Sequence, residues 1–205
     1  MGFSAAFDRL SSIMPPDRGE KACIDWTIIR GEWGSGLPQD YVRFIGAYGA
    51  GSIDDYLGVA SPTSSNSPGT LPIDLVSETE EARDVFRRNR QGLPAFVGAE
   101  SLIAWAHDSS SDLLCWIKTG DDPDSWPVAV WATDDGQWSV YEFGMVEFLV
   151  AIFDATLDEC PLGDTSLWGK ANPKFVSWAD QVRLRESGTD PWTGGPLPHF
   201  DEFGG

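Results

Sequence analysis

The chain has 205 residues, of which 41% are apolar and 10 are Trp, and its formal net charge is −18. This length fits one large domain with an ample core, and the lack of any run of about 18 apolar residues excludes a membrane-spanning helix. So acidic a chain repels nucleic-acid backbones and attracts basic partners, although an acidic surface also serves solubility alone.

Three helices are predicted in the first third of the chain, over residues 3–13, 21–33 and 38–48. Apolar residues spaced by three and four support the first and the third. Pro15-Pro16 ends the first helix because proline cannot continue it. Gly49 ends the third as a left-handed cap.

A strand is predicted over residues 52–60, and a surface loop rich in Ser, Pro and Gly over residues 61–72. A capping box, Ser77-Glu78-Thr79-Glu80, begins the next helix, and Gly92 ends it. The arginines of its last turn complement the helix dipole, so they need no nucleic acid to explain them. They are Arg87, Arg88 and Arg90.

Four antiparallel strands joined by turns are predicted in the centre of the chain, over residues 102–107, 113–117, 126–132 and 138–143. The strongest hairpin signal between them is Asp135-Gly136. An amphipathic helix follows from Met145 and is expected to pack on a sheet face. Because the third strand is apolar on both faces, we expect the sheet to be covered, at least in part, on both sides.

The C-terminal part has weaker signals. Residues 160–172 resemble a loop, and residues 175–185 fit a short strand or a short helix. Residues 187–205 form a tail rich in Gly and Pro, which is either disordered or laid on the body through its aromatic side chains. The predicted fold class is α+β, with an antiparallel or mixed sheet of about five to six strands packed with helices.

Three widely spaced cysteines, Cys23, Cys115 and Cys160, form no CxxC pattern and are odd in number. Buried reduced thiols are therefore expected. The first ten residues include an acid and lack the long apolar run of a secretory signal. We expect a cytoplasmic protein.

Catalytic and metal-binding motifs are absent from the sequence. His107 lies beside Asp108 and near Ser109, but no GxSxG elbow supports a nucleophile. Groups so close on one strand end cannot easily form a triad, so a histidine with a hydrogen-bond partner is favoured. The acidic loops lack the spacing of an EF-hand. We predict no enzyme activity, no cofactor and no metal.

The charge is concentrated in the predicted sheet and its following helix. Residues 91–169 carry 14 acids and one base, Lys118, and hence −13 of the total of −18. Two loops at strand ends hold the aspartates that we expect to contact a partner: Asp121, Asp122, Asp124, Asp134 and Asp135. Trp126 or Trp138 could anchor such a contact if exposed, but core packing is favoured for both.

Three blocks of the sequence resemble the SMI1/KNR4 family, also called the SUKH superfamily. They are LPQDYVRFIGAYGAGSIDDYLGVASP (residues 37–62), SDLLCWIKTGDDPDSWPVAVW (residues 111–131) and WSVYEFGMVEFLVAIF (residues 138–153). The family often has Gly-Asp where Ser111-Asp112 stands, and a serine near Gly144. The resemblance implies a SUKH-like domain over residues 1–160 and a C-terminal extension over residues 161–205.

The resemblance further implies a non-catalytic role. Bacterial members are immunity proteins that bind and neutralise a cognate polymorphic toxin, frequently a nuclease, in the cytoplasm of the producing cell. We therefore expect a basic toxin domain as the protein partner, with no nucleic acid and no membrane, and a monomer is favoured. The alternative is a protein-interaction or regulatory scaffold of the cell-wall-synthesis type, with no toxin partner.

Overall fold

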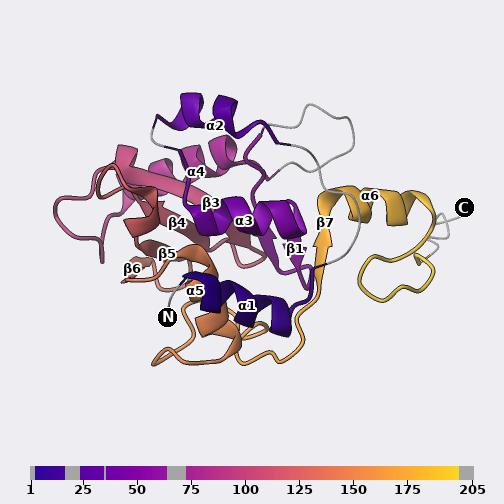
Figure 1. Ribbon diagram of the computed structural model, residues 1–205. Coiled ribbons are helices and arrows are strands. Elements are labelled where there is room, and N and C mark those ends of the chain that lie inside the picture. The colour runs from indigo at the N-terminus through magenta and orange to yellow at the C-terminus, as the bar shows by residue number, and fades with distance from the viewer. Residues whose placement is uncertain (1–2, 17–23, 35, 64–72, 199–205) are drawn as a thin grey trace, which may run out of the picture.

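The computed structural model describes residues 3–16, 24–34, 36–63 and 73–198 (Figure 1). The α-helices of this part are α1 (Phe3–Ile13), α2 (Trp26–Trp33), α3 (Gln39–Tyr48), α4 (Leu75–Arg88), α5 (Met145–Phe153) and α6 (Trp178–Glu186). Its strands are β1 (Gly51–Ile53), β2 (Leu57–Val59), β3 (Leu102–Asp108), β4 (Leu113–Ile117), β5 (Val128–Ala132), β6 (Gln137–Tyr141) and β7 (Phe175–Ser177). Two 3-10 turns are η1 (Ala99–Ser101) and η2 (Pro123–Ser125).

The strands form one antiparallel sheet in the order β6-β5-β4-β3-β2-β1-β7. The predicted α+β class is therefore confirmed, with seven strands in place of five to six. The additional strands come from two places, a hairpin near residue 55 and the C-terminal extension. No helix among the described residues has the length and apolar character needed to cross a membrane.

The single strand predicted over residues 52–60 is wrong, because the chain turns back on itself at Asp54 and Asp55. Both residues have positive φ, 52° and 57°, and the Tyr56 N–H donates to Ile53 O at 2.9 Å. Asp is one of the few residue types that adopts the left-handed region readily. The turn makes β1 and β2 a hairpin, with Ile53 opposite Leu57.

Both elements that the sequence allowed for residues 175–185 are present, since β7 leads directly into α6. β7 pairs with β1 and forms one edge of the sheet, where Figure 1 shows it beside α6 at the right. The domain boundary predicted at residue 160 stays a prediction, but the extension supplies a strand of the main sheet.

Of the tail, residues 187–198 are described. Within them Thr189 and Pro196 form a bridge, and the carbonyls of Pro191 and Trp192 accept from Lys174 Nζ.

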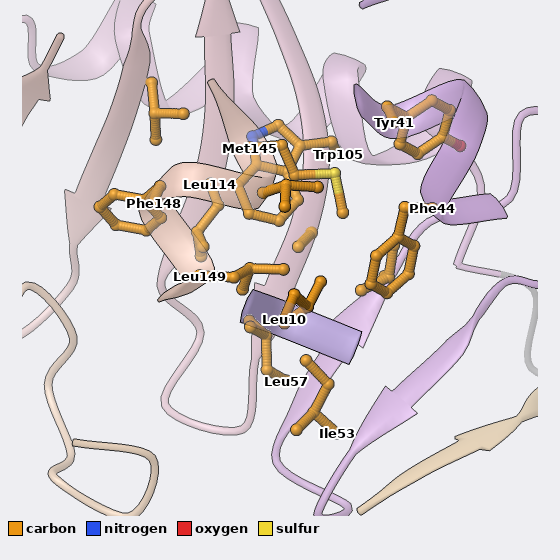
Figure 2. Packing of buried hydrophobic residues seen from close by; sticks show 14 of the residues in the cluster. Leu10, Tyr41, Phe44, Ile53, Leu57, Trp105, Leu114, Met145, Phe148 and Leu149 are labelled. Carbon is orange, nitrogen blue, oxygen red and sulfur yellow. The ribbon is translucent and has the colours of Figure 1, made fainter. Parts of the chain in front are cut away.

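One face of the sheet carries the main core, under α1, α3 and α5. Figure 2 shows Leu10 of α1 and Leu149 of α5 among the side chains that converge on Leu57 of β2. Trp105 and Trp116 lie side by side on the neighbouring strands β3 and β4, with ring centroids 6.0 Å apart. Large apolar groups buried in this way supply most of the driving force for folding.

The opposite face carries a smaller core under α4, built on Ala82 and Val85 of the helix and on Cys115, Ala129 and Trp138 of the strands. The sheet is thus covered on both faces, as the apolar pattern predicted. Trp126 and Trp138 are 1% and 2% exposed, so both belong to the core. Cys115 is also buried and unpaired, whereas Cys160 is half-buried and unpaired, and Cys23 lies outside the described residues.

The start and the end predicted for α4 are both wrong. Asp74, rather than Ser77, is the N-cap, and its Oδ1 accepts from the N–H groups of Val76 and Ser77 at 3.0 and 2.9 Å. The helix ends at Arg88, four residues before Gly92. Gly92 instead packs against the main chain of Trp138, where an added Cβ would lie 1.8 Å from the carbonyl oxygen.

Candidate functional site

The two acidic loops predicted to contact a partner lie at opposite ends of β5. The loop with Asp121, Asp122 and Asp124 precedes this strand, and the turn with Asp134 and Asp135 follows it. A strand of five residues separates them by roughly 16 Å at 3.3 Å per residue. All five carboxylates are exposed. The structure therefore brings Asp134 and Asp135 together, and Asp121, Asp122 and Asp124 together, but it does not join the two groups.

The loop before β5 uses part of its charge to hold the fold. Oδ1 of Asp122 accepts from the Asp124 N–H at 3.2 Å and begins the 3-10 turn η2. Oδ1 of Asp124 accepts from the Gln39 N–H at 2.6 Å, in the first turn of α3. Asp124 thus connects the loop to a helix N-terminus far away in the sequence. A spacing pattern along the chain contains no signal for such a contact.

The turn after β5 belongs to a larger group of turns at one end of the sheet. The register places Leu57 beside Asp108 and Leu113 beside Trp131. Consequently the turns at residues 54–56, 109–112 and 133–136 lie at the same end. The loop over residues 161–170 joins them, because the Gly163 N–H donates to Asp112 Oδ2 at 2.6 Å. We call residues 54–56, 108–112, 133–136 and 161–170 the turn end.

Two buried aspartates, which the sequence did not single out as site residues, organise the turn end. Asp108 is 2% exposed and Asp112 is 0% exposed. Oδ1 of Asp108 accepts from the N–H groups of Ser110 and Asp112, and its Oδ2 accepts from the Tyr56 hydroxyl at 2.8 Å. Oδ1 of Asp112 accepts from the Thr133 N–H at 2.8 Å. These bonds connect three turns and fix how their exposed acids are presented.

Burial raises the pKa of the Asp108 carboxyl, and the nearby charge of Asp112 acts in the same direction, against the hydrogen bonds that it accepts. Burial likewise raises the pKa of the Tyr56 hydroxyl. The turn-end segments carry seven carboxylates and one base, Lys170. The carboxylates are Asp54, Asp55, Asp108, Asp112, Asp134, Asp135 and Asp164.

The lysines near the turn end are already engaged. Lys170 Nζ lies 2.9 Å from Asp54 Oδ2. Lys174 Nζ donates to the carbonyls of Pro191 and Trp192 at 2.6 and 3.1 Å. The exposed aspartates of the β5–β6 turn, Asp134 and Asp135, form no ion pair with another described residue. A concentrated negative field results at this end of the molecule.

His107 and its neighbours do not form a nucleophilic triad among the described residues. His107 Nδ1 lies 2.7 Å from Glu78 Oε2 on α4, and this interaction raises the pKa of the imidazole. Ser109 Oγ donates instead to the main-chain carbonyls of Asp55 and Tyr56. His107 is therefore a strand-end histidine with a hydrogen-bond partner, which the sequence favoured. His199, the other histidine, lies outside the described residues.

The arginines at the C-terminal end of α4 are also bound within the chain. Arg87 Nη1 lies 2.6 Å from Asp84 and Arg88 Nη2 lies 3.3 Å from Glu81. Arg90 lies beyond the helix, and its Nη2 donates to the carbonyls of Pro94, Ala95 and Val97. Within the described ranges, no group of three or more His, Cys, Asp or Glu side chains is arranged to hold a metal ion.

The comparisons with known proteins give no relative for this chain. No protein-family model matches it, no curated protein matches its sequence, and no solved structure matches its fold.

Proposed function

We propose that this chain is a non-catalytic immunity protein, which binds a basic toxin domain through the turn end and so neutralises the toxin. One observation carries the proposal. Of the seven carboxylates at this end of the sheet, four are exposed, and the single base in the same segments, Lys170, is paired with Asp54. The exposed four are Asp55, Asp134, Asp135 and Asp164. The resemblance of three sequence blocks to the SMI1/KNR4 family supplies the kind of partner.

The electrostatic argument favours a nuclease toxin as that partner. A nuclease must be basic where it holds phosphates, and a negative surface of fixed shape can occupy the same groove. Long-range attraction between the two would speed their encounter, and this attraction weakens as salt screens it. The hydrogen bonds of Asp108 and Asp112 hold the turns in place, so little ordering of the backbone is needed on binding.

The turn end is favoured over the loop before β5 because Asp124 already serves the N-terminus of α3. Replacing Asp124 would disturb that helix as well as the surface charge. Asp121 and Asp122 remain candidates for the rim of the contact. The proposal places the binding event in the cytoplasm of the producing cell, where reduced cysteines are expected.

The first test is a pull-down of the tagged full chain from its native cells, at low and then at moderate salt. A basic partner with a toxin-like C-terminal domain, released as the salt rises, is the expected result. Recovery of cell-wall or housekeeping proteins without a toxin would favour the scaffold alternative and contradict the proposal.

The second test locates the contact with two matched double variants. Asp134→Asn with Asp135→Asn, and Asp121→Asn with Asp122→Asn, each remove two exposed carboxylates from opposite ends of β5. The first pair should slow association with the captured toxin at low salt by about tenfold and flatten its salt dependence, since steering can change association rates by 10- to 1,000-fold. The second pair should change it less. If both double variants slow association equally, or if neither does, the assignment of the contact to the turn end is wrong.

A further inference from the structure

A row of side chains crosses the sheet just inside the turn end, on the face that α4 covers. The register pairs Gly58 with His107, His107 with Leu113, Leu113 with Trp131, and Trp131 with Trp138. Directly paired residues in an antiparallel sheet point to the same face. These five residues therefore form one continuous row perpendicular to the strands.

The two ends of this row are covered by other parts of the chain. Above Gly58, an added Cβ would lie 2.4 Å from Ile73 Cδ1. Trp138 is 2% exposed, and its indole N–H donates to Asn89 O at 3.0 Å. The middle of the row is different, since His107 and Trp131 are only half-buried, although Leu113 between them is 4% exposed.

The uncovered middle is the floor of an open groove of about 580 Å³ between α4 and the turns, which we call the α4 groove. Its helix wall is a stripe of α4 at spacings of three and four, formed by Glu78, Glu81, Val85 and Arg88. Its opposite wall includes Asp108 of the turn end. All of these side chains except Val85 are charged. The helix therefore leaves the floor open, because charged side chains do not pack on it as apolar ones would.

The charges around the α4 groove favour a cationic occupant. Three acids line it, Glu78, Glu81 and Asp108, against one arginine, Arg88, which is paired with Glu81 at 3.3 Å. Asp108 is 2% exposed, so it contributes to the field of the groove rather than to its surface. His107 is bound to Glu78. The exposed Asp134 and Asp135 lie in the turn that follows the strand of Trp131. The groove thus combines an apolar, aromatic floor with negative walls.

We propose that the α4 groove receives an arginine side chain of a basic protein partner, with the guanidinium over the half-buried ring of Trp131. Arginine fits this surface better than lysine because its planar, weakly hydrated guanidinium stacks on aromatic rings. The inference rests on the proposed function only for the kind of partner. It adds the side chain that is bound and the place where it is bound.

The test uses the labelled full chain and a defined probe, the capped tripeptide acetyl-Ala-Arg-Ala-amide, followed by NMR. The expected result is a titration that shifts the amide signals of Leu113, Trp131 and Thr133. The citrulline peptide, which is neutral and nearly isosteric, should shift them far less. Free arginine should bind more weakly than the peptide, because the acidic walls repel its α-carboxylate. No shifts at millimolar peptide, or shifts spread evenly over the acidic surface, would overturn the inference.

Two glutamates of α4 provide a matched pair of variants. Glu81 and Glu80 are both exposed on the same helix, but only Glu81 lines the groove. Glu81→Gln should weaken binding of the arginine peptide about fivefold, the effect of one charge at close range in water. Glu80→Gln should leave it within about twofold, since a charge further from the site is screened. An equal loss in both variants would show a diffuse attraction and contradict the inference.

Trp131→Leu tests the floor, and it should weaken the arginine peptide about threefold through loss of the ring contact. Thermal unfolding of this variant checks that it folds. If it does not fold, the Glu81 and Glu80 variants still test the inference.

The inference and the proposed function can fail separately. Capture of a toxin that binds the Glu81→Gln variant as well as the Glu80→Gln variant removes the inference alone. Arginine binding in the groove without any toxin partner removes the function alone.

Discussion

At the scale of single residues, the contact between Asp40 and Gly144 shows how one side chain fixes the identity of another. Asp40 of α3 is 8% exposed, and its Oδ2 accepts from the Val146 N–H at 3.0 Å. It thus caps α5 from a different helix, since the N-cap residue Gly144 has no side chain for the purpose. A side chain at residue 144 would compete for the same space.

Gly144→Ala is therefore expected to destabilise the protein, although the φ of Gly144, −73°, suits any residue. A Cβ at this position would lie 2.7 Å from Asp40 Oδ2. Displacing a buried carboxylate should lower the free energy of unfolding by about 1–3 kcal/mol, the usual cost of overpacking. Urea denaturation measures the loss. Gly98→Ala is the control, because nothing lies within 4 Å of that Cβ. A similar loss in both variants would contradict the steric explanation.

His107 should make stability depend on pH near neutrality. Its hydrogen bond to Glu78 raises the pKa of the imidazole in the folded state, against the opposing effect of burial. The stabilising contribution is complete below the unfolded-state pKa of about 6.5 and is lost as the pH rises through the higher folded-state pKa. The free energy of unfolding of the wild type should therefore exceed that of His107→Gln by more at pH 6 than at pH 8.

Glu78→Gln provides the control for the histidine, because it keeps the imidazole and removes the group that raises its pKa. The difference in stability between pH 6 and pH 8 should shrink in this variant. An unchanged pH dependence in both variants would show that the titrating group lies elsewhere.

At the scale of elements, the sequence predicted most helices and the central strands well, because their signals are local and periodic. α1 and the strand pair β4 and β5 follow apolar runs that only a packed face explains. Two boundaries were missed although the contacts that set them are local. Asp74 caps α4 although Ser77 offers the better-known pattern, and the turn at Asp54 and Asp55 divides an apolar run that looks like one strand.

Only part of the candidate site could be predicted from the sequence. The exposed aspartates of the two loops could be identified from the chain, because turn chemistry marks strand ends. Their separation could also be inferred, because the strand predicted over residues 126–132 lies between the two loops. The register, which places the turn after β5 beside other turns, is not contained in one sequence. The buried Asp108 and Asp112 have partners in three different turns, so no spacing rule could assign their role.

Two substitutions test whether Asp74, rather than Ser77, caps the N-terminus of α4. Asp74→Ala should lower the free energy of unfolding by about 1–2 kcal/mol, because two N–H groups of the first turn lose their acceptor. Ser77→Ala should cost less, about 0.5 kcal/mol, because it removes only the hydroxyl that donates to Asp74 Oδ2 at 3.2 Å and leaves both capped N–H groups in place. Thermal or urea unfolding of the two variants decides between them. A larger loss of stability for Ser77→Ala than for Asp74→Ala would show that Ser77 is the N-cap, as the capping box predicts.

At the scale of the whole molecule, the C-terminal extension completes the sheet that the central unit begins. β7 pairs with β1, and the ring of Phe175 lies 5.6 Å from Phe44 and 5.4 Å from Tyr48 between their centroids. The extension is thus built into the main core, and the acidic turn end includes its loop over residues 161–170.

Ending the chain after Asn172 should therefore destabilise the whole sheet and not only remove an appendage. The loss of the contacts of the half-buried Phe175 alone should cost up to about 3 kcal/mol, the lower end of the range for a fully buried Phe replaced by Ala. Ending the chain after Pro198 is the control, because it keeps β7 and the contacts of Phe175. A shortened chain that melts at the temperature of the full one would show that the domain is complete without β7.

The pairing of β7 with β1 also sets an order in time. Gly51 pairs with Ser177, so the contact closes a long stretch of chain, and such contacts form slowly. At the usual pace of synthesis, β1 emerges from the ribosome on the order of ten seconds before β7 can reach it. Until then β1 is an open sheet edge with unpaired N–H and C=O groups, which another chain could join. The nascent protein is therefore most vulnerable to wrong association just before β7 is made.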